Sequence, residues 1–122
     1  MISFEVILLI FNITLKESGT HIGWCGVGVS NCLPQYKEIY YLIGRNNWGK
    51  GYAKEATAAL LDYSFNTIGL NEIAAMCKPE KIASRKVIEN MGLKYQHIVE
   101  GLPIELGYYN EEPFFCLQEM ST

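Results

Sequence analysis

The order of predicted elements in this 122-residue chain indicates a mixed α/β domain, in which helices pack on a central, mostly antiparallel sheet. Segments rich in β-branched and aromatic residues, separated by turn residues, fill the first third of the chain, as is typical of consecutive strands. Two later segments have apolar residues at helical spacing, and short apolar runs follow both of them. The length fits one domain over residues 1–122.

Three strands are expected at the start of the chain. The first, residues 1–13, is the most apolar stretch, but it is shorter than the ~20 residues that cross a bilayer. It also lacks the basic start and cleavage site of a signal peptide, so we expect a cytoplasmic protein with no membrane contact. A turn at 17–20 joins it to a second strand, 21–30, as a hairpin, and a third strand follows at 36–43.

The first helix is expected at residues 52–68, after a polar, glycine-bearing loop at 44–51 that we expect to be irregular. Ala56 and Leu60 lie four residues apart on its apolar face, and Gly69 stands where a helix C-cap favours glycine.

A second helix and three short strands complete the predicted fold. The helix, residues 82–91, has a stripe of apolar residues and ends at Gly92. A loop that carries several glycines joins the last two strands. The strands are expected at 72–77, 93–99 and 113–118.

Charge and cysteine content exclude several function classes. Ten basic and thirteen acidic residues give a net charge of −3, so nucleic-acid binding as the main role is not expected. The four cysteines form no C-x-x-C motif, and the two histidines lie far apart in the sequence. We therefore predict neither a metal site nor a disulfide scaffold.

The loop between the third strand and the first helix indicates an anion-binding site, because glycines before a helix N-terminus expose amides at its positive end. Gly44 to Lys50 also satisfies the Walker A pattern, but Gly51 stands where that motif needs Ser or Thr. The only aspartate, Asp62, lies inside the helix, which leaves no Walker B carboxylate. A purely structural turn at Gly49 and Gly51 is the alternative.

Two motifs in order suggest one family. The segment WGKGYAKEA, residues 48–56, is followed by KIASRKVIENMGLKY, residues 81–95, with EIYYLI at 38–43 just before the first. This pattern resembles the GNAT superfamily of N-acetyltransferases, and within it the ribosomal-protein N-terminal acetyltransferase-like branch. The resemblance extends from about residue 11 to about residue 117. It implies a GNAT-like sheet and acetyl-CoA-dependent transfer of an acetyl group to a primary amine.

The resemblance also implies which residues bind coenzyme A. Backbone amides of the loop would hold the pyrophosphate, with charge added by Lys50, and Tyr52 begins the helix. Lys81 replaces the family's asparagine and is a poor N-cap. Arg85 could meet the 3′-phosphate, as could Lys86. The full set of expected cofactor residues is Leu42, Ile43, Asn46, Asn47, Trp48, Gly49, Lys50, Gly51, Tyr52, Lys81, Ser84 and Arg85.

Two side chains are expected to take part in catalysis. Ser84 matches the family serine that can protonate the departing thiolate. Ile88 occupies the place of the usual acid tyrosine, which leaves Ser84, or a water, as the acid. Glu38 is the candidate base, acting directly or through a water, with an exposed strand-edge glutamate as the alternative. Amides near Leu42 and Ile43 would stabilise the oxyanion. An α-amine, with a pKa of ~8 against ~10.4 for lysine, needs less help from a base.

The acceptor and the activity stay open at the level of sequence. Relatives in this family carry a strand and two helices before the hairpin, and the chain starts almost at the hairpin. We expect an apolar sheet edge that supports a homodimer. The first function is acetylation of the α-amino group of a protein or peptide. The alternatives are a non-catalytic coenzyme A-binding remnant and transfer to a small amine, such as a polyamine or an aminoglycoside, which Glu100, Glu105, Glu111 and Glu112 could attract.

Overall fold

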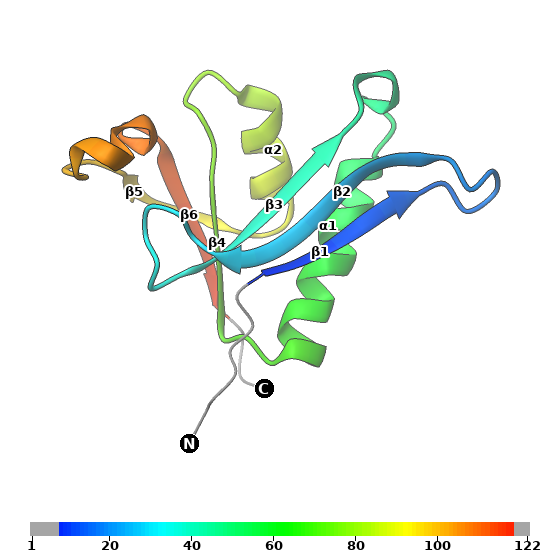
Figure 1. Ribbon diagram of the computed structural model, residues 1–122, viewed down its shortest axis with the longest axis horizontal. Coiled ribbons are helices and arrows are strands. Elements are labelled where there is room, and N and C mark those ends of the chain that lie inside the picture. Colours follow the sequence, from blue (N-terminus) through cyan, green and yellow to red (C-terminus); the bar gives the residue numbers. More distant parts are fainter. Residues whose placement is uncertain (1–7, 119–122) are drawn as a thin grey trace.

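The computed structural model describes residues 8–118, so the first seven residues of the expected first strand lie outside the described residues. Six strands form one sheet in the order β1-β2-β3-β4-β6-β5 (Figure 1). Neighbouring strands are antiparallel except for β3 and β4, which are parallel, and this confirms the predicted mixed, mostly antiparallel sheet. The strands are β1 Leu8–Thr14, β2 His21–Val29, β3 Lys37–Ile43, β4 Glu72–Met76, β5 Lys94–Ile98 and β6 Pro113–Gln118.

Strands β1 and β2 form the predicted hairpin. Phe11 lies opposite Cys25 in the register, and the Leu15 amide closes the turn by donating to the Thr20 carbonyl at 2.8 Å. The β1 strand pairs with β2 alone in the part of the chain that the structure describes, so it is an edge of the sheet.

Both helices pack on the same face of the sheet. Helix α1, Tyr52–Tyr63, continues through a wider π-helical turn, Ser64–Ile68, and ends at Gly69, which has φ +84°. The helical segment thus reaches Ile68 as predicted, but its last turn is not α-helical. The Ser64 hydroxyl donates to the Leu60 carbonyl at 2.7 Å, and such back-bonding disturbs the regular ladder. Helix α2 is Ile82–Asn90.

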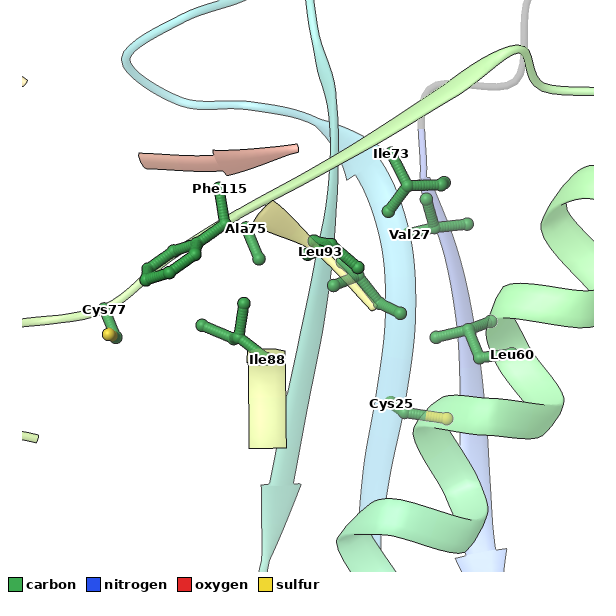
Figure 2. Packing of buried hydrophobic residues seen from close by; sticks show 10 residues of the cluster. Cys25, Val27, Leu60, Ile73, Ala75, Cys77, Ile88, Leu93 and Phe115 are labelled. Carbon is green, nitrogen blue, oxygen red and sulfur yellow. The ribbon is translucent and has the colours of Figure 1, made fainter. Parts of the chain in front are cut away.

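The main core fills the space between the two helices and the sheet (Figure 2). It contains the odd-numbered Ile39 of β3, together with Val27, Ile73 and Phe115, which are 5% exposed or less. Ala74, Val99 and Phe114 form a smaller cluster on the opposite face. Because successive residues of a strand point to opposite faces, odd-numbered residues of β3 face the helices and even-numbered ones face away. The buried residues of the main core are Cys25, Val27, Ile39, Leu60, Ile73, Ala75, Cys77, Ile88, Leu93 and Phe115.

Two segments that we predicted to be irregular contain 3₁₀ turns, which corrects the prediction. Arg45–Asn47 forms one within the glycine loop, and Ile104–Tyr109 forms one between β5 and β6. Each is closed by an i→i+3 bond, such as that from the Asn47 amide to the Gly44 carbonyl at 2.9 Å. Such single turns need no apolar periodicity, so composition does not reveal them. Within residues 8–118, neither helix combines the length and apolarity needed to cross a bilayer.

Candidate coenzyme A and acyl-transfer site

The sheet opens between β3 and β4. Within the described residues these strands share one register pair, Glu38 with Ala74, and β3 then runs away from β4 toward Ile43 (Figure 1). The Gly44 amide donates to the Ile22 carbonyl of β2 at 2.8 Å. Along an antiparallel strand, every second residue directs its N–H and C=O groups at the same neighbouring strand. The backbone groups of Leu42 therefore face β2, whereas those of Tyr41 and Ile43 face the opening. An added Cβ on Gly23 of β2 would strike the Leu42 carbonyl oxygen, which agrees with this orientation.

The glycine loop leads from the end of β3 into α1. Gly49 and Gly51 have φ of +76° and +81°, a conformation that glycine adopts without strain. In the described chain the amides of Gly49, Lys50 and Gly51 have no backbone partner, and no side chain caps α1. An added Cβ on either glycine would meet nothing within 4 Å, so the loop is open on the side where a side chain would stand. A helix N-terminus with free amides fits a phosphate group.

Trp48 fixes this loop to the opening of the sheet. Its indole Nε1 donates to the Ile43 carbonyl at 2.7 Å, although 63% of the side chain is exposed. Arg45 lies 6.0 Å from the indole ring. Asn46 and Lys50 are exposed beside it, so their side chains are accessible to a ligand on the loop.

The three candidate site residues at or near the start of helix α2 differ in their surroundings. Lys81 is the N-cap residue and makes no side-chain cap bond, as its residue type predicts. Arg85 is engaged away from the glycine loop, since its Nε lies 2.8 Å from Glu89 Oε1 and its guanidinium 5.7 Å from the Tyr95 ring. Ser84, one turn into α2, is half-buried, and its hydroxyl opposes the rise that burial causes in the pKa of the Tyr41 phenol.

Glu38 is buried rather than exposed, with 7% of its surface accessible, which rules out the exposed strand-edge alternative. Burial raises the pKa of its carboxyl to about 7. The nearby Glu112 raises this pKa further, while hydrogen bonds from Ser30 and Tyr40 oppose the rise. The Ser30 hydroxyl lies 2.8 Å from Glu38 Oε1. A carboxyl with this pKa can accept a proton at neutral pH.

The candidate acid and base therefore lie on opposite faces of β3. Glu38 and Tyr40 point away from the helices, whereas Tyr41 packs against the main core. Sequence reasoning missed Tyr41, Ser30 and Tyr40. The alternation of strand residues could have placed Tyr41 on the helix side and Tyr40 on the opposite side.

A groove of about 840 Å³ lies elsewhere, between α1 and the β1–β2 hairpin. Its walls include Phe11 and Ile13 of the edge strand and Ala59 and Tyr63 of α1. Glu38 and Ser84 do not line it, so this groove and the opening between β3 and β4 are different features.

The sequence of the chain matches one family of known proteins. The Acetyltransferase (GNAT) domain family matches residues 5–94. The chain belongs to the GNAT acetyltransferase family. This GNAT chain is 37% identical over 89 residues to N-acetyltransferase p20 of Bacillus licheniformis, a protein named as uncharacterized, covering 73% of this chain and 50% of that protein. It spans about half the length of the curated relatives it matches.

Solved GNAT structures share its fold. The acetyltransferase from Agrobacterium tumefaciens str. C58 superposes with a TM-score of 0.75 at 26% identity, over 90% of this chain and 60% of that chain. Mycobacterium smegmatis RimJ, solved in complex with CoA-disulfide, superposes with a TM-score of 0.74 at 24% identity, over 92% of this chain and 53% of that chain. The GNAT-like sheet that the motifs implied is thus confirmed.

Proposed function

We propose that residues 1–122 form one acetyltransferase domain, of the ribosomal-protein N-terminal acetyltransferase-like branch. Its reaction is transfer of an acetyl group from acetyl-CoA to a primary amine, foremost the α-amino group of a protein or peptide. The observation that carries this proposal is the uncapped start of α1, with free amides at Gly49–Gly51, beside the opening between β3 and β4. Bound acetyl-CoA supplies an activated acyl thioester.

The amides of the glycine loop hold the pyrophosphate in this proposal, because they converge at the positive end of the α1 dipole. Lys50 adds positive charge, and the Trp48–Ile43 bond keeps the loop at the opening. The amide of Ile43 faces the opening and is the proposed oxyanion donor. The residues proposed to contact coenzyme A are Leu42, Ile43, Asn46, Asn47, Trp48, Gly49, Lys50, Gly51, Tyr52, Lys81, Ser84 and Arg85.

In this proposal the base and the acid act from opposite faces of β3. The amine approaches on the face that carries Glu38, which accepts its proton directly or through a water. Ser84 lies on the α2 side and donates a hydrogen bond to the sulfur from which the acyl group departs. This arrangement puts the base and the leaving group on opposite sides of the opening, where a direct transfer needs them.

The pKa of Glu38 supports an α-amine as the acceptor. A carboxyl with a pKa of about 7 lies about one unit below an α-ammonium, whose pKa is ~8. It lies more than three units below a lysine-like amine, whose pKa is ~10.4. Proton transfer to Glu38 is therefore far less uphill from an N-terminus than from a polyamine.

Solved proteins of the same fold are named for acetyl transfer to other amines. The α-amine acceptor of this chain is therefore our proposal. They include a spermidine N-acetyltransferase from Vibrio cholerae and an aminoglycoside acetyltransferase solved with coenzyme A. At 20% and 18% identity they share the fold, and the fold alone does not select an acceptor.

An acetyl-transfer screen tests the proposed function. The chain is incubated with acetyl-CoA and, separately, a pool of short peptides with free α-amines, spermidine or kanamycin, and thiol release is followed. We expect turnover with the peptide pool and lower turnover with the two small amines. Turnover confined to spermidine or kanamycin would favour the small-amine alternative. Coenzyme A binding without any transfer would favour the non-catalytic remnant.

The proposal includes a homodimer through β1. The strand carries no charge and no proline, which are the usual protections of an exposed edge. A two-fold axis at Phe11 pairs two copies antiparallel and keeps Leu9, Phe11 and Ile13 on one face. Phe11 and Ile13 line the groove beside α1, so a second copy would extend the sheet over apolar surface that is otherwise open.

Sedimentation at micromolar concentration tests this dimer. We expect a dimer for the wild-type chain and a monomer for Phe11→Lys, because two lysines would oppose each other at the axis. Tyr95→Lys on the other edge strand, β5, is the matched control and should stay dimeric. A monomeric wild-type chain would refute the pairing.

A further inference from the structure

The ammonium of Lys78 is held by the protein in the way that a bound amine would be. Lys78 follows β4, and its Nζ lies 2.9 Å from Oε2 of Glu112, which immediately precedes β6. The same Nζ donates to the Tyr108 carbonyl and lies 3.5 Å from the centre of the Tyr108 ring. A carboxylate, a carbonyl oxygen and an aromatic face each attract an ammonium. These three groups form an ammonium site that one of the chain's own lysines fills.

This ammonium site lies on the face of the sheet where the acceptor amine is proposed to approach. Met76 of β4 pairs with Phe114 of β6, and both pack in the cluster on the face away from the helices. Lys78 comes two residues after Met76 and Glu112 two residues before Phe114, so their ion pair continues the same face. Glu38 also points to this face. Burial, and then the charge of Glu112, raise the pKa of Glu38, which agrees with a site beside the proposed base.

The Lys78 side chain stands between Glu112 and solvent. The side chain of Glu112 is 6% exposed, whereas that of Lys78 is 24% exposed. Desolvation lowers the pKa of Lys78, but the hydrogen bond and the charge of Glu112 raise it by more, so the ammonium keeps its charge at neutral pH. Tyr108 is exposed, so a small amine from solvent can reach the ammonium site once Lys78 is removed.

We propose that Lys78 is a specificity-determining residue, which fills an ammonium site beside the proposed base and so excludes acceptors that carry a second positive charge. The proposal rests on the function proposed above and deepens it, because it narrows the acceptor to an amine with no second ammonium nearby. A polyamine that presents one amine to Glu38 brings its next ammonium toward Lys78. Lys78 repels that charge and already occupies the carboxylate that would bind it.

The stability of Lys78→Ala tests the ammonium site without any turnover. The variant lacks three methylene groups and the ammonium, which together have the size of propylamine. Because Glu112 then stays buried without its partner, we expect the unfolding temperature to fall by at least about 4 °C. Propylamine should raise it again in a saturable way, and should leave the wild type unchanged. 1-Propanol, of the same size and without charge, is the control ligand and should not restore it.

Acceptor preference gives the second readout. The kcat/KM for spermidine is divided by that for one peptide that the chain acetylates. We expect this ratio to rise at least about 10-fold in Lys78→Ala, because the freed Glu112 binds the second ammonium. Adding Glu112→Gln should remove the gain. Lys16→Ala, at an exposed lysine of the β1–β2 turn, deletes the same charge elsewhere and should keep the ratio within about two-fold.

Lys78→Met is the second variant, for use if Lys78→Ala does not fold. It keeps an apolar stem beside the Tyr108 ring and removes only the ammonium. If the folded variant is not stabilised by propylamine, if its spermidine ratio does not rise, or if the rise persists with Glu112→Gln, the inference is overturned. If the folded wild type does not bind acetyl-CoA, the proposed function fails and the role in specificity fails with it. Stabilisation by propylamine would then still show the ammonium site, because it needs no cofactor.

Discussion

Gly51→Asp is expected to lose at least about 100-fold in affinity for acetyl-CoA, which corresponds to about 2.7 kcal/mol of binding free energy. Gly51 is the N-cap of α1, its amide has no backbone partner, and an added Cβ would meet nothing within 4 Å. An aspartate there would cap the helix with its own carboxylate, occupy the amides and repel the pyrophosphate. Isothermal titration of the variant with acetyl-CoA measures the loss.

The matched control is Gly69→Asp. Gly69 has φ +84°, close to the +81° of Gly51, and an added Cβ meets nothing within 4 Å at either position. Both variants therefore carry a similar backbone strain of ~1–3 kcal/mol and the same new charge, and only one lies at the loop. We expect Gly69→Asp to bind acetyl-CoA like the wild type. Equal affinities for both variants would show that the glycine loop does not hold the cofactor.

Glu38→Gln is expected to lower kcat by about 100-fold or more, since a general base contributes 10²–10⁴-fold, and to leave acetyl-CoA affinity unchanged. In the wild type, kcat/KM should fall as the pH drops through about 7, because the carboxyl must be ionised to accept the amine proton. The variant should lack this acidic limb. A pH–rate profile of both proteins measures the effect.

The unfolding temperature of Glu38→Gln shows whether a change in its kcat comes from the lost base or from a change in folding. The pKa of Glu38 is raised in the folded state from 4.5 to about 7, so its ionisation costs stability as the pH rises through that window. Glu38→Gln should therefore gain more in unfolding temperature at pH 8 than at pH 5. Glu17→Gln, at an exposed glutamate of the turn between β1 and β2, is the control. Full turnover by a folded Glu38→Gln protein would exclude Glu38 as the base.

Much of the fold could be predicted because its signals are local. Apolar runs between turn residues predict all six strands, and helical spacing with a terminal Gly69 predicts the helix that reaches Ile68. The short 3₁₀ turns and the π-helical turn were not predicted, because a few hydrogen bonds decide them. The Ser64 hydroxyl donates a hydrogen bond to the Leu60 carbonyl, but nothing in the sequence distinguishes Ser64 from other helical serines.

The site was predictable where its chemistry depends on the backbone and less so where it depends on packing. Glycines before a helix imply positive φ and free amides, and Gly49 and Gly51 have both. The burial of Glu38 and its bond to Ser30 come from the register of β2 and β3, which one strand pattern does not specify.

The central claim is that the free amides at Gly49–Gly51 bind acetyl-CoA, because every proposed step depends on that binding. Isothermal titration of the wild-type chain with acetyl-CoA tests it most directly. Thermal unfolding in the same buffer checks that the titrated protein is folded. The account predicts one binding site per chain with a micromolar Kd and a matching rise in unfolding temperature. A folded chain that shows no binding at millimolar acetyl-CoA would contradict it.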